Sequence, residues 1–125
     1  MHAIAELACV AVGGALGASI RHAVSGPLAG RAGISSWVAI IALNIVGSVL
    51  AGVLVGMWAP DQGRWVKAFL LIGVSGGLTT FSTAMLDTWV LWATNRRGLA
   101  MFCLLGTPVL VILGAMLGQA IGVRA

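Results

Sequence analysis

Four long apolar windows, separated by short polar segments, dominate the hydropathy pattern of this chain. The windows are nearly free of charge and cover Ala3–Ile20, Trp37–Trp58, Ala68–Leu86 and Leu99–Val123. A helix needs about 20 apolar residues to cross the hydrocarbon core of a bilayer. Because backbone groups in lipid must pair within their own segment, windows of this length predict transmembrane helices. The pattern therefore predicts an all-α membrane protein with four spans.

Short segments with turn-forming or charged residues separate the predicted spans. They cover Ser25–Ser36, Ala59–Lys67 and Asn95–Gly98, and each contains the Gly, Pro, Ser or Asn residues that favour turns. Pro108 lies inside the last window and predicts a kink there, because proline cannot donate a backbone hydrogen bond. No connecting segment is long enough to fold alone, so we expect a single four-helix transmembrane domain over residues 1–125.

The composition excludes most classes of soluble protein. Of the 125 residues, 60% are hydrophobic and only 8% are charged, which is too little polar surface for a water-soluble domain. The windows leave no room for a nucleotide-binding fold or a nucleic-acid reader. No nucleophile lies beside a base, so we expect no enzymatic activity. Cys9 and Cys103 fall in apolar windows, which predicts packing residues rather than a disulfide.

The basic residues divide almost evenly between the two sides of the predicted membrane domain. Three lie on the side of the termini and the second loop and four on the other side: Arg64, Lys67 and Arg124 against Arg21, Arg31, Arg96 and Arg97. An excess of Lys and Arg on one side normally sets the orientation of a membrane protein. With so little bias, the chain is expected to insert both ways, and two opposite copies would pair about a twofold axis in the membrane plane.

Glycines recur at intervals of four residues in three of the predicted spans. The sets are Gly13 and Gly17, then Gly52 and Gly56, then Gly114, Gly118 and Gly122. Small residues at this spacing let helix backbones approach closely in lipid. We therefore expect these glycines to pack helices together.

The third window contains glycine and hydroxyl residues where a membrane helix is usually apolar. The run Gly76–Thr83 reads Gly-Gly-Leu-Thr-Thr-Phe-Ser-Thr, and its helix propensity is low. We expect the helix to break there. A break exposes carbonyl groups, which can bind a cation, and amide groups, which can bind an anion. The alternative is a flexible glycine kink whose threonines bond back to their own helix.

Isolated polar side chains in the other spans are candidate anion ligands. Asn44 is the amide of the second window, and its two donors suit an anion, although hydrogen bonding between helices is an equal alternative. Thr107 offers a hydroxyl in the fourth window. Arg21 keeps its charge at any working pH. It would raise the anion concentration at a pore mouth, or it would simply extend to the membrane interface.

The order of these motifs resembles the CrcB/Fluc fluoride channel family. The resemblance covers the whole chain and rests on Gly13–Ala18 leading to Arg21, on Asn44 with Gly47 and Ser48, and on Gly76–Thr83. It implies an antiparallel dual-topology dimer, formed by two copies or by two related chains. Such a dimer has two narrow pores that export fluoride passively across the plasma (inner) membrane and give fluoride resistance.

The resemblance also implies roles for particular residues. A structural sodium ion would be held by the backbone carbonyls of Gly76 and Thr79, at the broken third helix. A small anion crosses lipid only where donors replace its hydration shell, and a phenylalanine ring has a positive edge that can face an anion. The predicted anion pore comprises Asn44, Phe81, Ser82, Thr83 and Thr107, with Arg21 in its vestibule.

Two positions depart from the family pattern and leave alternatives open. Ala84 stands where the family usually has a second pore phenylalanine, and Cys103 stands where the fourth helix often has tyrosine. Met85 or another side chain fills the gap, or conduction is altered, or a related chain supplies the ring. The chain could also be a non-conducting subunit. A small proton-coupled multidrug exporter is the rival class, but it needs a deep carboxylate and Glu6 lies near the start of its span.

Overall fold

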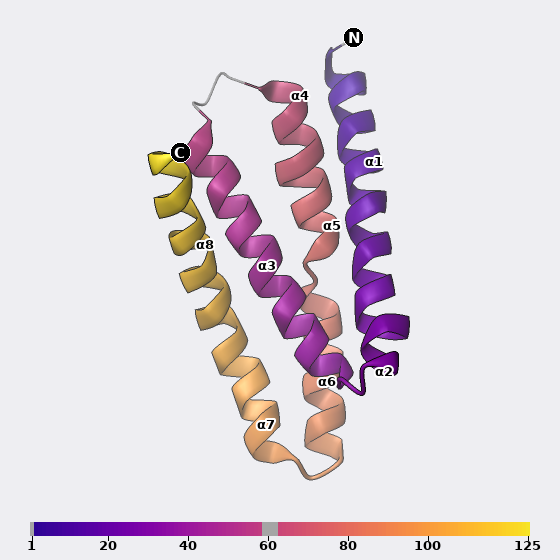
Figure 1. Ribbon diagram of the computed structural model, residues 1–125. Helices are drawn as coiled ribbons and strands as arrows, with labels where there is room; N and C mark the ends of the chain where they lie inside the picture. The colour runs from indigo at the N-terminus through magenta and orange to yellow at the C-terminus, as the bar shows by residue number, and fades with distance from the viewer. Residues whose placement is uncertain (1, 59–62) are drawn as a thin grey trace.

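The computed structural model describes residues 2–58 and 63–125, and the regular elements in those ranges are all helical. Four helical stretches are long and apolar enough to cross a membrane: His2–Arg31, Ser36–Met57, Arg64–Ala93 and Arg97–Arg124. They lie side by side and alternate in direction (Figure 1). The prediction of an all-α protein with four membrane-spanning helices is confirmed.

Three of the four stretches consist of several helical segments. The first contains α1 (His2–Ala23), η1 (Val24–Leu28) and α2 (Ala29–Arg31), and the second is α3 (Ser36–Met57). The third contains α4 (Arg64–Val66), η2 (Lys67–Ser75), α5 (Gly76–Leu78) and α6 (Phe81–Ala93). The fourth contains α7 (Arg97–Met101), η3 (Phe102–Gly106) and α8 (Thr107–Arg124). The segments η1 to η3 are π-helical, so their hydrogen bonds span five residues.

Two of the π-helical segments lie at prolines. Pro27 is inside η1, and Pro108 is the second residue of α8, directly after η3. A proline lacks the N–H group of the helical ladder, and its ring crowds the carbonyl four residues earlier. A wider turn accommodates both effects. At Pro108, where the sequence predicts a kink, the observed irregularity is this wider turn.

The prediction of a first loop over Ser25–Ser36 is wrong for most of that range. The helix continues through Arg31, and only residues 32–35 are non-helical. The Ser25 hydroxyl donates to the Arg21 carbonyl at 2.8 Å and so stays within the helix. Glycine and proline break helices in water, but a backbone that leaves the helix near lipid loses its hydrogen-bond partners. The helix therefore persists through these turn-forming residues.

The other two connections between the helical stretches lie closer to the loops that the sequence predicts. Of the predicted second loop, Ala59–Lys67, residues 59–62 lie outside the described residues, and helix resumes at Arg64. The place of the third loop is confirmed but its bounds differ from Asn95–Gly98, because the connection from α6 to α7 covers residues 94–96 and α7 already begins at Arg97. Asn95 has a φ of 60° in this turn, a left-handed conformation that asparagine tolerates well.

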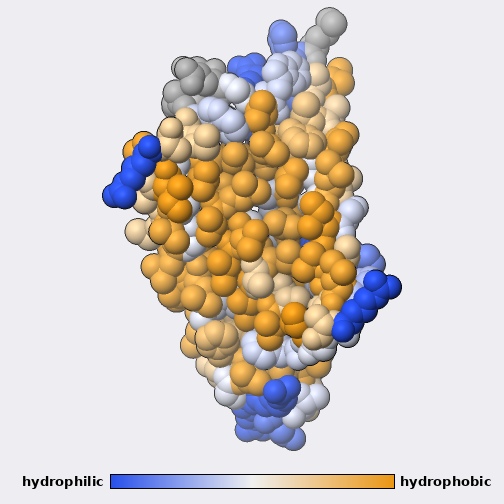
Figure 2. Space-filling view, viewed as in Figure 1, coloured by the Kyte–Doolittle hydropathy of each residue, from blue (hydrophilic) through white to orange (hydrophobic). Residues whose placement is uncertain are grey.

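Helix α3 is the central helix of the domain. In its most apolar window 44% of the residues are buried, against 11% in the first stretch and 22% in each of the other two. Large apolar side chains are exposed along the outer helices, and Figure 2 shows hydrophobic residues over most of the visible face, with hydrophilic residues at the two ends and at the left and right edges. The outer surface is therefore suited to contact lipid.

Glycines bring two pairs of helices into backbone contact, as the sequence predicts. Helix α1 packs along η2 and α5, and α3 packs along α8. A Cβ atom added to Gly13 or Gly17 would lie less than 3.0 Å from the backbone of the third stretch. The same holds between α3 and α8 for four residues: Gly52, Gly56, Gly118 and Gly122. Gly114 is less tightly packed, with the Val49 Cγ2 atom 3.3 Å from an added Cβ.

We expect Gly13→Ala to destabilise the domain, because the added methyl group would collide with the Phe69 carbonyl and the Gly73 Cα atom. Overpacking of this kind costs about 1–3 kcal/mol. Gly14→Ala is the matched control, since only the Gly73 carbonyl lies within 4 Å of its added Cβ, at 4.0 Å. Thermal unfolding in detergent gives the melting temperature of each variant. Equal melting temperatures for the two would contradict this packing.

Candidate functional site

The third helical stretch leaves the helical conformation at two residues. Helix α5 ends at Leu78, and α6 begins at Phe81. Between them, Thr79 has φ −85° and ψ 150°, and Thr80 has φ −153° and ψ 125°, which are both extended conformations. Figure 1 shows this extended segment between α5 and α6. Its backbone groups therefore need partners from outside the helical ladder.

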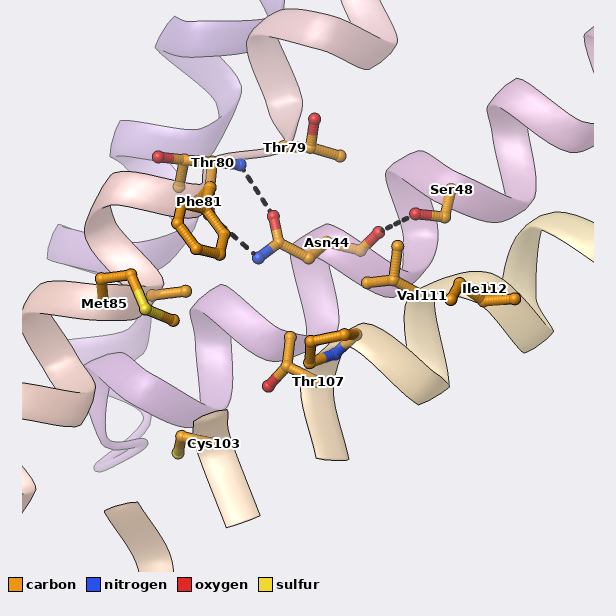
Figure 3. A pocket seen from close by; sticks show the side chains of 12 residues that line it. Asn44, Ser48, Thr79, Thr80, Phe81, Met85, Cys103, Thr107, Val111 and Ile112 are labelled. Atoms are coloured by element: carbon orange, nitrogen blue, oxygen red, sulfur yellow. Dashed lines mark hydrogen bonds between the residues drawn. The ribbon is translucent and has the colours of Figure 1, made fainter. Parts of the chain in front are cut away.

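Asn44 on α3 supplies those partners for Thr80. The Asn44 Oδ1 atom accepts a hydrogen bond from the Thr80 N–H at 2.8 Å, and the Asn44 Nδ2 atom donates to the Thr80 carbonyl at 3.1 Å (Figure 3). The Asn44 side chain is buried, with 6% exposed. A primary amide has two N–H bonds, and this pairing uses one of them. Asn44 thus links two helices and retains a second donor.

This pairing changes the surroundings of two backbone carbonyls. In a continuous helix the Thr80 N–H would donate to the Gly76 carbonyl, but here it donates to Asn44. The Thr79 hydroxyl lies 3.5 Å from the Gly76 carbonyl and 3.1 Å from the Ser75 carbonyl. The Thr79 carbonyl accepts a hydrogen bond from Arg21 Nη1 at 3.3 Å. Gly76 is exposed and Arg21 is half-buried. Because the Arg21 guanidinium binds the Thr79 carbonyl, its positive charge lies directly beside the interruption.

Hydroxyl groups gather at the first turn of α6. The Thr80 Oγ1 atom accepts a hydrogen bond from the Thr83 N–H at 3.3 Å, which makes Thr80 the N-cap of this helix. The same atom lies 3.2 Å from Ser82 Oγ and 3.3 Å from Thr83 Oγ1. Ser82 is exposed and Thr83 is half-buried. These hydroxyls cluster with Thr80, and they lie outside the cleft described next.

A cleft of about 390 Å³ lies between the interruption, α3 and the fourth stretch. It brings together three of the predicted pore residues, Asn44, Phe81 and Thr107, and also Thr79 (Figure 3). The remaining lining residues are Ser48, Thr80, Ala84, Met85, Cys103, Pro108, Val111 and Ile112. No charged side chain lines the cleft among the described residues. It is therefore an uncharged cleft with a few polar groups on apolar walls.

Two residues of the cleft are unusual for their environments. Thr107 is 6% exposed, and its hydroxyl has no hydrogen-bond partner within the described part of the chain. Phe81 is 74% exposed although it lies beside the interruption. Ala84, which replaces the expected second phenylalanine, is buried, and Met85 lines the cleft next to it. A ligand that accepts a hydrogen bond would satisfy the Thr107 hydroxyl.

Sequence reasoning missed the part that Thr80 plays. Its backbone pairs with Asn44 and its hydroxyl caps α6. The signal that could have found it is a capping residue, threonine, directly before the apolar start of a helix. Residues 2–58 and 63–125 hold no group of three or more His, Cys, Asp or Glu side chains that could bind a metal ion. A sodium ion bound to this part of the chain would therefore need backbone carbonyl groups as ligands. Cys9 and Cys103 are both free thiols.

The chain is similar to known proteins over most of its length. The family described as CrcB-like protein, Camphor Resistance (CrcB), matches residues 8–119. The fluoride-specific ion channel FluC of Paracoccus denitrificans is 37% identical over 113 residues, which are 90% of each chain. The FluC channel of Novosphingobium aromaticivorans is 39% identical over 118 residues, or 91% of this chain and 93% of the relative.

A third relative, the fluoride-specific ion channel FluC 2 of Nitrobacter hamburgensis, is 37% identical over 114 residues, or 90% of this chain and 92% of the relative. The matched residues 8–119 include the second and third helical stretches in full, with the interruption in the third, and most of the first and fourth. The resemblance seen in the sequence motifs is thereby confirmed, and the chain belongs to the CrcB/Fluc family.

Proposed function

We propose that this chain forms a fluoride-selective channel, which lets fluoride leave the cell down its electrochemical gradient and so gives fluoride resistance. Its relatives are named as fluoride-specific ion channels. The single observation that carries the proposal is the buried hydroxyl of Thr107, which has no hydrogen-bond partner among residues 2–58 and 63–125; Thr107 lines the same cleft as Asn44. This is a channel function, not an enzymatic one, in agreement with the sequence.

The chemistry of the cleft favours a small anion over a cation. A strongly hydrated anion can cross lipid only where donors replace its water. The Thr107 hydroxyl and the second N–H of Asn44 are such donors, and the ring edge of Phe81 adds a weak positive field. A cation site would need carboxylates or several converging carbonyls, and the described lining contains no carboxylate.

The other predicted pore residues have roles next to the cleft. We assign the exposed Ser82 and the half-buried Thr83 as hydroxyl donors for an ion that approaches along α6. Arg21 binds the Thr79 carbonyl at 3.3 Å, where its permanent charge raises the local anion concentration. Arg21 is not among the residues that line the cleft, so its positive charge lies outside the cleft.

We further propose that two chains assemble as an antiparallel, dual-topology dimer with one pore for each cleft. The even division of basic residues between the two sides supports dual insertion. Phe81 supports an interface at the interruption, because a phenylalanine that is 74% exposed next to polar backbone is well placed to pack against a second chain. The broken third helix would then be the crossing point of the two copies.

The interruption also suits a structural sodium ion held by the Gly76 and Thr79 carbonyls. The Gly76 carbonyl is released from the helical ladder because the Thr80 N–H donates to Asn44. A carbonyl has two lone pairs, so Thr79 can accept from Arg21 and still bind a cation. Rings of backbone carbonyls replace the water of monovalent cations in other channels. Since one chain offers only two carbonyls here, we propose that both copies contribute.

The rival exporter is disfavoured by the surroundings of Glu6. Proton-coupled drug export needs a carboxylate deep in the membrane that faces the substrate path. Glu6 instead lies in the first turns of α1 and forms an ion pair with Arg64 on α4, at 3.3 Å between Nε and Oε1. This pair lies at one end of the bundle. We therefore propose no proton-coupled transport.

A heterodimer with a related chain is the second candidate, and Ala84 favours it. The small, buried Ala84 leaves the cleft without the ring that the family usually provides. A partner that carries this phenylalanine would complete the lining, and this chain would then act as one subunit of a shared channel. In either case it is a multi-pass membrane protein, and we place it in the plasma (inner) membrane.

Purified chain in liposomes is expected to release fluoride rapidly and chloride slowly, as measured with ion-selective electrodes. Asn44→Asp should abolish fluoride release. A carboxylate about 4 Å from the ion would repel it by about 4 kcal/mol at an effective dielectric constant of ~20, or roughly a thousandfold in rate. Equal rates of fluoride and chloride release would contradict the proposal. Release that requires a second family member would identify the heterodimer.

Thr107→Val should slow fluoride release by about tenfold without loss of thermal stability. Valine keeps the shape of threonine but removes a buried hydroxyl that has no partner in the part of the chain that the structure describes, and such a removal is nearly neutral or stabilising. Thr88→Val is the control, because the Thr88 hydroxyl is satisfied by the Ala84 carbonyl at 2.8 Å and lies outside the cleft. Unchanged release from Thr107→Val would remove this residue from the pore.

Gly98→Cys tests the dual topology in intact cells. Position 98 lies beside the turn between α6 and α7, and an added Cβ there meets nothing within 4 Å. With both native cysteines replaced by alanine, about half of the protein should react with a membrane-impermeant maleimide from outside if the two orientations are equally populated. All of it should react after the membrane is permeabilised. Complete or absent labelling in intact cells would establish a single orientation.

A further inference from the structure

A second hollow, which we call the outer groove, lies between α3 and the η1–α2 end of the first stretch. Its volume is about 380 Å³. All of its lining residues are aliphatic: Val24, Leu28, Ala29, Ala32, Ile34, Val38, Ala39, Ala42, Leu43 and Val46. We propose that the outer groove binds one acyl chain of an anionic phospholipid, whose phosphate group is held by Arg31. This lipid site is separate from the proposed anion path.

Small residues form the floor of the outer groove, and larger ones form its rim. Ala29 and Ala39 are buried on the floor. On the rim, the exposed fractions of Leu28, Val38 and Val46 are 52%, 40% and 57%. Because Val38 and Val46 are eight residues apart, the α3 wall runs for about 12 Å. A groove without polar groups offers water no hydrogen bonds, whereas a flexible acyl chain gains dispersion contacts along its whole length.

The outer groove faces away from the cleft and from the proposed subunit interface. Ala42 and Val46 each lie two residues from Asn44, which places them about 160° from it around the helix. The cleft and the exposed Phe81 are on the Asn44 side of α3. A second copy that packs at the interruption therefore leaves the outer groove uncovered. In a bilayer, the material that meets this face is the acyl chains of lipids.

A glycine turn fixes the position of Arg31 at one end of the groove. Helix α2 ends at Arg31, and Gly33 follows with a φ of 68° (Figure 1). The Gly33 N–H donates to the Gly30 carbonyl at 3.3 Å, and the Ile34 N–H donates to the Ala29 carbonyl at 2.8 Å. These two hydrogen bonds form a Schellman motif. The motif sets Ile34 beside Ala29 in the groove, with Arg31 between them in the sequence.

No side chain among the described residues neutralises Arg31. It is exposed, and it forms neither an ion pair nor a side-chain hydrogen bond within residues 2–58 and 63–125. Because α3 begins five residues later, at Ser36, Arg31 lies at the membrane end of this span. A guanidinium group binds a phosphate through two parallel hydrogen bonds, and basic residues at this level attract anionic lipids.

An acidic residue at the same end of the bundle, Asp87, lies across α3 from the outer groove. Both of its carboxylate oxygens are 3.4 Å from the Ser36 hydroxyl. Ser36 lies two residues from Val38, or about 160° around the helix, so the body of α3 separates the carboxylate from the groove. A helix is about 10 Å across and the Debye length at physiological salt is about 8 Å. The repulsion between Asp87 and a phosphate at Arg31 is therefore weak.

Native mass spectrometry of the purified chain tests the site with defined lipids. Phosphatidylglycerol should bind about fivefold more tightly than phosphatidylcholine with the same acyl chains, and Arg31→Gln should remove this preference. Arg96→Gln is the matched control, because Arg96 is an exposed arginine at the same end of the bundle and away from the outer groove. Equal losses from the two variants would overturn the proposal and assign the binding to surface charge in general.

Filling the outer groove tests the binding of the acyl chain. Ala42→Leu places a larger side chain in the groove at an exposed position, and it should weaken phosphatidylglycerol binding several-fold although Arg31 is intact. Ala11→Leu is the control, since Ala11 is exposed on α1 outside the groove. Thermal unfolding checks that both variants are folded. Unchanged lipid binding by Ala42→Leu overturns the proposal.

The same spectra give the mass of each assembly and so distinguish lipid from protein as the occupant. We expect phosphatidylglycerol to stay bound to paired chains as well as to single ones. Lipid that is retained only by single chains and lost when chains pair would overturn the proposal and identify the outer groove as a protein interface. Displacement of the lipid by inorganic phosphate alone would also contradict it, because the acyl chain would then contribute nothing.

Discussion

A pair of hydrogen bonds between Asn44 and Thr80 holds the polar centre of the structure in place. Extended backbone at membrane depth is stable only where protein groups satisfy it. Asn44 presents both an acceptor and a donor to one residue, at 2.8 and 3.1 Å. The helix can therefore stop after Leu78 and begin again at Phe81 without unpaired groups on Thr80. The released Gly76 carbonyl and the hydroxyls at the start of α6 both follow from this pairing.

Close helix packing is what brings Asn44 within reach of the interruption. A Cβ on Gly47 would lie 2.5 Å from Thr79 Cγ2, and one on Gly77 would collide with the backbone of α1. Only glycine permits these approaches at both faces of the third stretch. Large apolar side chains gain little by leaving lipid for the protein interior, and here most of them stay outside. The position of the interruption therefore depends on close glycine contacts and on the Asn44–Thr80 hydrogen bonds more than on the burial of large side chains.

The sequence predicts what depends on local spacing and fails where distant residues decide. Span lengths and glycine intervals are local, and both predictions hold. The predicted first loop is wrong because Gly26 and Pro27 break helices in water, whereas here both lie within the helical segment η1. The Asn44 contact joins residues 36 apart, and a lone amide gives the same signal whether it bridges helices or faces a pore.

The interruption separates groups of opposite polarity over a few residues. Carbonyls of Gly76 and Thr79 end one half of the stretch, and Arg21 lies against the Thr79 carbonyl. Donors face the other side, where Asn44 and Thr107 line the cleft. A bare cation in that lining would bind fluoride too strongly for release, since conduction needs sites that an ion can leave. In the proposed channel, the neutral donors inside the cleft let the ion leave, and the Arg21 guanidinium, bound to the Thr79 carbonyl outside the cleft lining, attracts it.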